Sequence, residues 1–356
     1  MQYFRFSIIF SIICMAIAAW WGWSHAGLTG MLSALLITGV LAVMEVSLSF
    51  DNAVVNASVL KHWDHFWKTL FLTVGMIIAV FGMRLLFPLV IVGVTADMSL
   101  VEVAKLALNS PAEYSAKLLA HHAEIAAFGG MFLLLVFLGF LFDEEKEDHW
   151  FHWFEHRISK LGKVDSAAIF VAMLVLIFSL SLVPAAEQHV ILLSGLWGIL
   201  TYVGVNVIGA LLESDDGEGE EGKSSSGDAA KTVARAGIGG FIYLEVLDAS
   251  FSFDGVIGAF AITSDVVIIM LGLAIGAMFV RSMTIFLVEK GTLDAYIFLE
   301  HGAHYAIGAL AAIMLLSMKF HIPEVVTGLI GVAFIVWAVF DSIRHTKREA
   351  AKQSGF

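Results

Sequence analysis

The chain has 356 residues, of which 59% are hydrophobic and only 15% are charged. Because about a quarter of the residues in soluble proteins are charged, this composition and a mean hydropathy of +0.87 exclude a water-soluble protein. The formal net charge of -12 also argues against nucleic-acid binding, which requires a basic surface.

Ten apolar runs follow one another along the chain, and each is long enough for a bilayer crossing, which takes about 20 apolar residues. They cover residues 6–23, 29–60, 68–92, 117–142, 165–183, 190–212, 236–262, 265–288, 294–316 and 323–341. We therefore expect an all-α polytopic membrane protein with about ten transmembrane helices. An alternative for the first run is a secretory signal with Ser24-His25-Ala26 as its cleavage site.

The Lys and Arg residues are distributed unequally between the two sides of the predicted membrane. Fifteen lie on the side that holds both termini and three on the other side, while Arg84 and Arg281 fall inside spans. The positive-inside rule therefore places both termini in the cytoplasm. We expect a multi-pass protein of a bacterial-type inner membrane.

Two predicted cytoplasmic connections have unusual compositions. His149, His152 and His156 in the first one share a helical face and could bind a metal, but an amphipathic helix at the lipid headgroups is the favoured interpretation. The second one, at 213–231, is acidic and of low complexity. We expect it to be a disordered linker, with a role in concentrating cations as the alternative.

An internal repeat links the second span to the seventh. The segment Glu45-Val-Ser-Leu-Ser-Phe-Asp51-Asn52 returns as Asp248-Ala-Ser-Phe-Ser-Phe-Asp254-Gly255. In each case the next span contains an arginine nine residues after a glycine, and a weaker match relates 118–124 to 298–304. Five crossings separate the two units, so they have opposite orientations in the bilayer. Transporters with such inverted repeats bind their substrate at the midplane, where broken helices meet.

The repeat suggests a division of the chain into seven segments. These are a first transmembrane helix (1–27, the possible signal anchor), a first repeat with spans two to four (28–142), an amphipathic connection (143–164), spans five and six (165–212), an acidic loop (213–231), an inverted second repeat with spans seven to nine (232–318), and span ten with a basic tail (319–356).

Carboxylates are predicted near the middle of the membrane. They are Glu45, Asp51, Glu245, Asp248 and Asp254, with Glu124 and Glu300 at shallower depth. Each costs about 2.5 to 3.5 kcal/mol at the bilayer centre and requires a cation, a proton or an arginine. Arg84 and Arg281 are candidate counterions, but the acids outnumber them, which favours a cation or proton pathway over structural pairing. A helix break at Asn52 or Gly255 would let the acids address one cavity.

The available ligand types indicate which cation could bind. Carboxylate, amide and hydroxyl oxygens suit Mg, Ca or Mn, and imidazoles favour Mn, Fe, Co or Zn. His121 and His304 are candidates for ligands, proton-path residues or ordinary hydrogen-bonded side chains. Cys14 is the single cysteine, so a thiolate site is not expected.

Enzyme motifs are missing from the sequence. It contains no His-Glu-x-x-His, no Gly-x-Ser-x-Gly and no P-loop, which argues against an enzyme or an ATP-driven pump. We expect gradient-driven transport, with a divalent cation as substrate and no tightly bound cofactor. The expected partners are the lipid bilayer and the metal ion, not nucleic acid.

At these residues the sequence resembles the TerC-type tellurium-resistance integral membrane proteins, and most closely a sister branch of unknown function. The resemblance is carried by Glu45 to Asn52, with its Phe-Asp-Asn triplet, and by Glu245 to Gly255. It implies export of a divalent metal, chiefly manganese, within a wider superfamily of small-solute exporters. The implied metal site consists of Glu45, Asp51, Asn52, Asp248 and Asp254.

This chain departs from the usual family pattern in its extra first span and its acidic insert at 213–221. Two other functions stay open. One is a membrane scaffold in an envelope-stress or tellurite-resistance complex, and the other is proton-coupled export of a small organic solute. A cavity lined with acids favours a cation over an amino acid, whose carboxylate is usually bound by helix N-termini.

Overall fold

The computed structural model describes residues 3–143, 149–158, 166–213 and 237–353, together with Lys146 and Val164, and this part of the chain is helical without any strand. Within it, seven helical stretches are long and apolar enough to cross a membrane, which makes the chain a multi-pass membrane protein. They are Arg5–Leu48, His65–Gly93, His122–Phe142, Gln188–Gly209, Val266–Glu289, Leu299–Ser317 and Val325–Arg348. The acidic loop predicted at 213–231 lies almost wholly outside the described residues.

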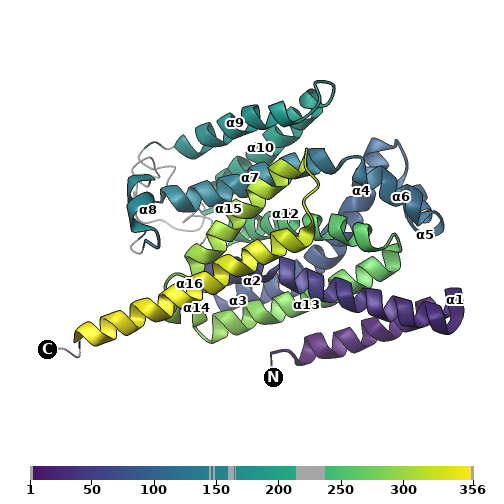
Figure 1. The fold of residues 1–356 in the computed structure, drawn as a ribbon, viewed down its shortest axis with the longest axis horizontal. Coiled ribbons are helices and arrows are strands. Elements are labelled where there is room, and N and C mark those ends of the chain that lie inside the picture. The colour runs from purple at the N-terminus through teal and green to yellow at the C-terminus, as the bar shows by residue number, and fades with distance from the viewer. Residues whose placement is uncertain are drawn as a thin grey trace.

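The first of these stretches, α1 (Arg5–Leu48), folds back on itself as a helical hairpin (Figure 1). Its turn is at Ala26 and Gly27, and Gly27 has φ 60° and ψ -144°, a backbone conformation that favours glycine. The two arms approach closely where Gly22 faces Gly30, since a Cβ on Gly22 would lie 2.3 Å from the Gly30 carbonyl oxygen. The predicted first and second spans are therefore the arms of one hairpin.

The second arm ends at Leu48, and α2 (Phe50–Leu60) begins after Ser49. The helix is therefore interrupted at Ser49. The sequence predicted this break three residues later, at Asn52. The other predicted break, at Gly255, is wrong, because α12 (Ile238–Ile262) is continuous. Its glycine instead makes room for a side chain of α1, as described below.

The next crossing contains two π-helical segments, a rare geometry that is often associated with functional sites. It runs through α3 (His65–Leu70), η1 (Phe71–Gly75), η2 (Ile78–Leu86) and α4 (Phe87–Thr95). The short helices α5 (Leu100–Asn109) and α6 (Pro111–Leu119) lead from it to the core helix α7 (His122–Phe142).

The remaining helices complete the bundle. They are α8 (His152–Ile158), α9 (Ala167–Ser179) with a 3-10 turn (Leu180–Leu182), α10 (Gln188–Glu213), α12, α13 (Val266–Glu289), α14 (Thr292–Ala295), α15 (Leu299–Ser317) and α16 (Glu324–Gln353). The apolar helix of α9 and its turn is short, and the 25 residues of α12 include three acids, so neither is among the seven stretches above.

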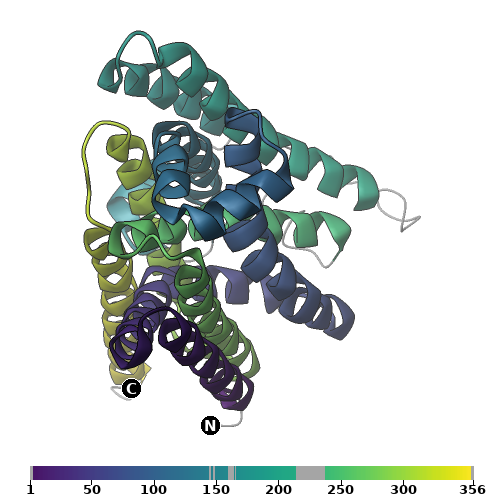
Figure 2. The ribbon, with the colours of Figure 1, turned by 90° about the vertical axis from the view of Figure 1, so that its right-hand side faces the viewer.

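Packing arranges these helices in two groups (Figures 1 and 2). In one group, α7 packs against α10 and α15, and α15 also packs against α16. In the other, the α1 hairpin packs along α13. Between the groups, α2 and α12 contact helices of both. These two central helices carry the buried polar residues.

Candidate functional site

Two central helices each bury a stripe of polar side chains. Along the second arm of α1 and α2, the polar residues are spaced by four, three and four, and along α12 by three and four, so each set lies on one helical face. All are at most 7% exposed. We call these residues the polar cluster: Glu45, Ser49, Asn52 and Asn56 from the first stripe, and Glu245, Asp248 and Ser252 from the second.

Side-chain hydrogen bonds join the two stripes. The amide of Asn52 donates to the carboxylate of Asp248 across the interface. Within the first stripe, the Ser49 hydroxyl donates to Glu45 Oε1 at 3.1 Å. Asp248 also interacts electrostatically with Glu45 and with Glu245. The repeat-related residues Glu45 and Asp248 therefore lie in one cluster.

Arg84 enters this cluster from η2. Its Nη2 atom donates to Glu45 Oε1 at 2.5 Å, and both side chains of this ion pair are at most 3% exposed. Its Nη1 atom donates to the carbonyl of Ala79, five residues earlier, at 3.0 Å. One guanidinium thus interacts with two carboxylates of the cluster, those of Glu45 and Asp248, while Glu245 adds a third acid. The ionised cluster would have a net negative charge.

Glycines make space for the two glutamates. A Cβ on Gly276 of α13 would lie 2.4 Å from Glu45 Cβ, and one on Gly255 would lie 2.8 Å from Glu45 Oε2. A Cβ on Gly75 of η1 would lie 2.3 Å from Glu245 Oε1. Each glutamate therefore packs against a glycine of the other predicted repeat, and its carboxylate position depends on that glycine.

Several buried oxygen atoms of the cluster have no hydrogen-bond partner among the described residues. They are both carboxylate oxygens of Glu245, the amide oxygens of Asn52 and Asn56, and the hydroxyl of Ser252. Buried acceptors without a donor are costly, so these atoms are suited to receive a proton or a cation. Among the described residues, however, no three His, Cys, Asp or Glu side chains already form a metal-binding group.

The aspartates that follow phenylalanine in the repeat are placed differently. Asp51 is buried in the first turn of α2, where it accepts a hydrogen bond from the Asn52 N–H. Its carboxylate faces Gly331 of α16, and no described hydrogen bond joins it to a side chain of the polar cluster. Asp254 lies in α12, but its side chain is outside the described part of the structure.

The residues predicted as secondary ligands or as a proton path lie in two other places. His121 and Glu124 are 3.1 Å apart in a cavity of about 410 Å³ that is also lined by Phe128 and Trp197. Glu300 is 3.9 Å from Lys61.

Near Glu300, the Nδ1 of His304 donates to the Glu300 carbonyl at 2.9 Å. The His304 ring stacks on Phe140 with 3.9 Å between centroids. None of these groups bonds to the polar cluster in the described residues. Their role as a proton path stays a prediction.

Arg281, the predicted counterion of the second repeat, forms different contacts from those of Arg84. Its Nε atom donates to the Leu72 carbonyl, and its guanidinium lies 5.8 Å from the centre of the Phe6 ring. No ion pair with a carboxylate is found for it in the described part of the chain. The two arginines are therefore not equivalent in their surroundings.

Sequence reasoning missed a buried group in the connection between α7 and α9, which was predicted to be cytoplasmic. Glu155 of α8 is fully buried, 3.1 Å from Lys146 and 3.6 Å from His301, and it accepts a hydrogen bond from Tyr305 at 2.9 Å. Burial raises the pKa of Glu155, but Lys146 and the Phe151 N–H overcome this effect and hold the pKa below its usual value. Burial lowers the pKa of Lys146.

This group anchors α8 to α15. The outer side of α8 carries Trp153, which is 71% exposed and suits a membrane interface. The predicted amphipathic helix is present, but its polar inner side carries the anchor.

His149 and His156 belong to the predicted histidine face, and the centres of their rings are 6.1 Å apart. The side chain of His152 is outside the described part.

Comparison with known proteins identifies a family without a known activity. The model of a family described as a protein of unknown function (DUF475) matches residues 50–349. No curated protein and no solved structure matches the chain. The resemblance to a sister branch of unknown function agrees with this result, whereas TerC membership itself stays a prediction.

Proposed function

The chain belongs to the DUF475 family of proteins of unknown function, and we propose that it is a membrane transporter that exports a divalent metal cation, most favourably manganese. The observation that carries the proposal is Glu245. Its two carboxylate oxygens are buried beside Asp248, and no described residue donates a hydrogen bond to them. A carboxylate inside a membrane protein requires a counter-charge, and the guanidinium of Arg84 is already paired with Glu45.

The ligand chemistry supports a hard cation. Glu245 and Asp248 supply carboxylates, and the amide oxygens of Asn52 and Asn56 and the hydroxyl of Ser252 supply neutral oxygens. Oxygen ligands of this kind suit Mg, Ca and Mn. Because carboxylates of the described residues do not form a closed metal-binding group, we propose that the cation draws Glu245 and Asp248 together when it binds.

We propose ten crossings and an inverted repeat for this transporter. The count takes the two arms of α1 separately, with α2 continuing the second, and includes α9 and α12 with the longer helices. Support for a pseudo-twofold relation comes from the repeat-related glycines Gly75 and Gly272. Gly75 packs on Glu245 of α12 and Gly272 packs on Leu41 of α1, so each glycine contacts the repeated helix of the other unit. Both termini are cytoplasmic in this proposal, and an ion gradient drives transport.

Metal flux through the purified protein tests the function. Liposomes containing the wild-type protein and a trapped metal-sensitive dye should take up Mn²⁺ faster than protein-free liposomes. Glu245→Gln removes the charge at nearly constant volume, so uptake should slow by roughly tenfold or more. Glu113→Gln is the matched control, because Glu113 is 60% exposed next to Lys117, and it should behave as wild type.

The alternatives predict other results. A scaffold would show no flux in the same liposomes, and its deletion would leave the manganese content of cells unchanged. A proton-coupled exporter of an organic solute would conduct protons without Mn²⁺ transport. Equal Mn²⁺ flux in wild-type and Glu245→Gln liposomes would contradict the proposed site.

A further inference from the structure

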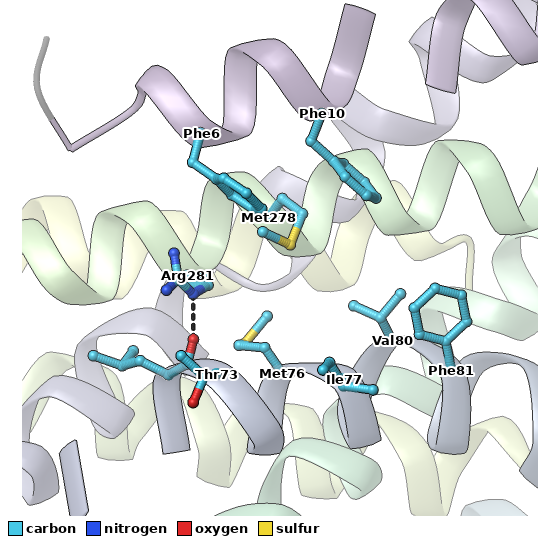
Figure 3. A pocket seen from close by; sticks show the side chains of 10 residues that line it. Phe6, Phe10, Thr73, Met76, Ile77, Val80, Phe81, Met278 and Arg281 are labelled. Atoms are coloured by element: carbon cyan, nitrogen blue, oxygen red, sulfur yellow. Dashed lines mark hydrogen bonds between the residues drawn. The ribbon is translucent and has the colours of Figure 1, made fainter. Parts of the chain in front are cut away.

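A second concave site lies between three helices, and none of its lining residues belongs to the polar cluster. It is a cavity of about 270 Å³ between the start of α1, the π-helical crossing and α13. Figure 3 shows Phe6 and Phe10 on one side and Met76, Ile77 and Phe81 on the other. The walls are almost entirely apolar.

One cation interrupts this apolar lining. Arg281 lies at one end of the cavity in Figure 3, where its Nε atom donates to the Leu72 carbonyl. A guanidinium has five N–H donors, and this bond uses one of them. No carboxylate pairs with Arg281 among the described residues, and the group is only partly buried. No acceptor for its remaining donors is found among the described residues, so they are available to a group from outside the chain.

The depth of Arg281 fits an acceptor from the membrane. It lies eight residues before Glu289, the end of α13, which corresponds to about 12 Å along the helix. Phe6 is the second residue of α1, so the cavity is close to the helix ends at one membrane face. A guanidinium at such a depth extends towards the phosphate layer, while the apolar cavity below it lies at acyl-chain depth.

We propose that this cavity binds an anionic phospholipid, with the phosphate on Arg281 and part of an acyl chain between Phe6, Phe10 and the π-helical crossing. Guanidinium and phosphate form paired, charge-assisted hydrogen bonds. Basic pockets between transmembrane helices bind lipid headgroups in this way. The bordering helix ends carry two bases, Arg5 and Lys290, and one acid, Glu289. This net positive charge favours a net anionic lipid over a zwitterionic one. The inference depends on the membrane setting and is independent of the transported substrate.

Lipid retention measured by native mass spectrometry tests this proposal. The full-length protein is equilibrated in detergent with equal amounts of phosphatidylglycerol and phosphatidylcholine, and the bound lipids are counted. Wild type should retain phosphatidylglycerol preferentially. Arg281→Gln should reduce this retention by about tenfold, the factor expected for loss of a charge-assisted hydrogen bond.

Two further variants separate the parts of the site. Thr73→Trp places a large ring in the cavity without changing Arg281, and it should also release the lipid. Arg344→Gln removes a guanidinium that is 73% exposed, and it should retain lipid as wild type does.

Three outcomes would overturn the proposal: equal retention in wild type and Arg281→Gln, undiminished retention in Thr73→Trp, or displacement of the lipid by excess inorganic phosphate. The last result would indicate a site for free phosphate. Transport assays on the same variants keep the two proposals distinguishable, because loss of lipid does not require loss of Mn²⁺ binding.

Discussion

The carboxylate of Glu245 rests on Gly75, so closely that a Cβ at residue 75 would lie 2.3 Å from Glu245 Oε1. The nearest obstructing atom is the far end of a flexible side chain, and the next one, Phe71 Cδ2, would lie 3.1 Å from the added Cβ. Gly75→Ala should therefore displace the carboxylate at a small cost in stability, at the low end of the 1 to 3 kcal/mol typical of overpacking, while Mn²⁺ transport falls strongly. The measurement compares thermal unfolding with liposome flux.

Gly39→Ala is the control for this variant, since nothing lies within 4 Å of an added Cβ there. Gly276→Ala provides the contrast. Its Cβ would meet Glu45 Cβ at 2.4 Å and the Ala42 carbonyl at 3.0 Å, atoms that cannot move away easily, so stability should fall more than in Gly75→Ala. The opposite order would show that the Glu245 carboxylate is rigidly fixed.

The Glu45–Arg84 ion pair predicts strong coupling between its two members. Either Glu45→Gln or Arg84→Gln leaves a buried charge without its partner, which costs about 3 to 5 kcal/mol. The double variant should lose less than the sum of the two single losses. A double-mutant cycle on unfolding free energy measures this coupling, and additive losses would exclude a direct pair.

Anchoring of α8 should depend on pH. The folded-state pKa of Glu155 lies below its ordinary value of 4.5, so its ion pair stabilises the docked helix above that pH. This contribution is lost as the pH falls through the lowered folded-state pKa. The protection factors for hydrogen exchange of residues 149–158 should therefore fall at acid pH in wild type.

The same protection factors should already be low at neutral pH in Glu155→Gln, because Lys146 then lacks the Glu155 carboxylate as its ion-pair partner. Glu113→Gln serves as the control and should leave exchange unchanged. If the protection of α8 in the wild-type protein did not depend on pH, Glu155 would not be the anchor.

The long apolar runs made much of the helical architecture predictable. The predicted span at 265–288, for example, corresponds to α13 (Val266–Glu289), because charge and an N-cap aspartate at 265 define its ends. Contacts between distant segments were not predictable. Glu155 and Tyr305 meet across 150 positions, and the burial of Glu155 has no signature in its own helix.

The candidate site was predictable in part, from the internal repeat and from helical spacing. Glu45 and Asp248 were apparent from the repeat, and Asn56 could have been found from its i, i+4 spacing to Asn52 on one face. The helix interruption at Ser49 does not bring Asp51 to that face. The π-helical geometry around Arg84 also gives no simple sequence pattern, since its hydrogen bonds shift by one residue from those of an α-helix.

Topology can be tested with reporter fusions. The 15 to 3 distribution of Lys and Arg predicts that fusions after Glu221 and Phe356 read cytoplasmic, while a fusion after Glu187 reads extracytoplasmic. A cytoplasmic signal after Glu187 would reverse part of the assignment, and an external 213–231 loop would contradict the inverted repeat.

Substitution of the individual aspartates distinguishes the groups that bind the cation. Asp248→Asn keeps an acceptor for the Asn52 amide but removes the charge on which a hard-cation site depends. Export should therefore fail, by roughly tenfold or more, while the protein still folds. Asp51→Asn should have a smaller effect, because the Asp51 carboxylate faces Gly331. The repeat predicts that Asp254→Asn resembles Asp51→Asn.

Intracellular manganese under metal load, at matched membrane levels of each variant, measures these effects, with zinc, iron and magnesium as controls. Wild-type manganese content in Asp248→Asn cells would defeat the proposed site. If Asp51→Asn and Asp254→Asn abolished export as fully as Asp248→Asn, both aspartates would have to reach the cation in another conformation. Rotation of α2 about the interruption at Ser49 would then be required, because no side-chain movement alone turns residue 51 to the face of Asn52.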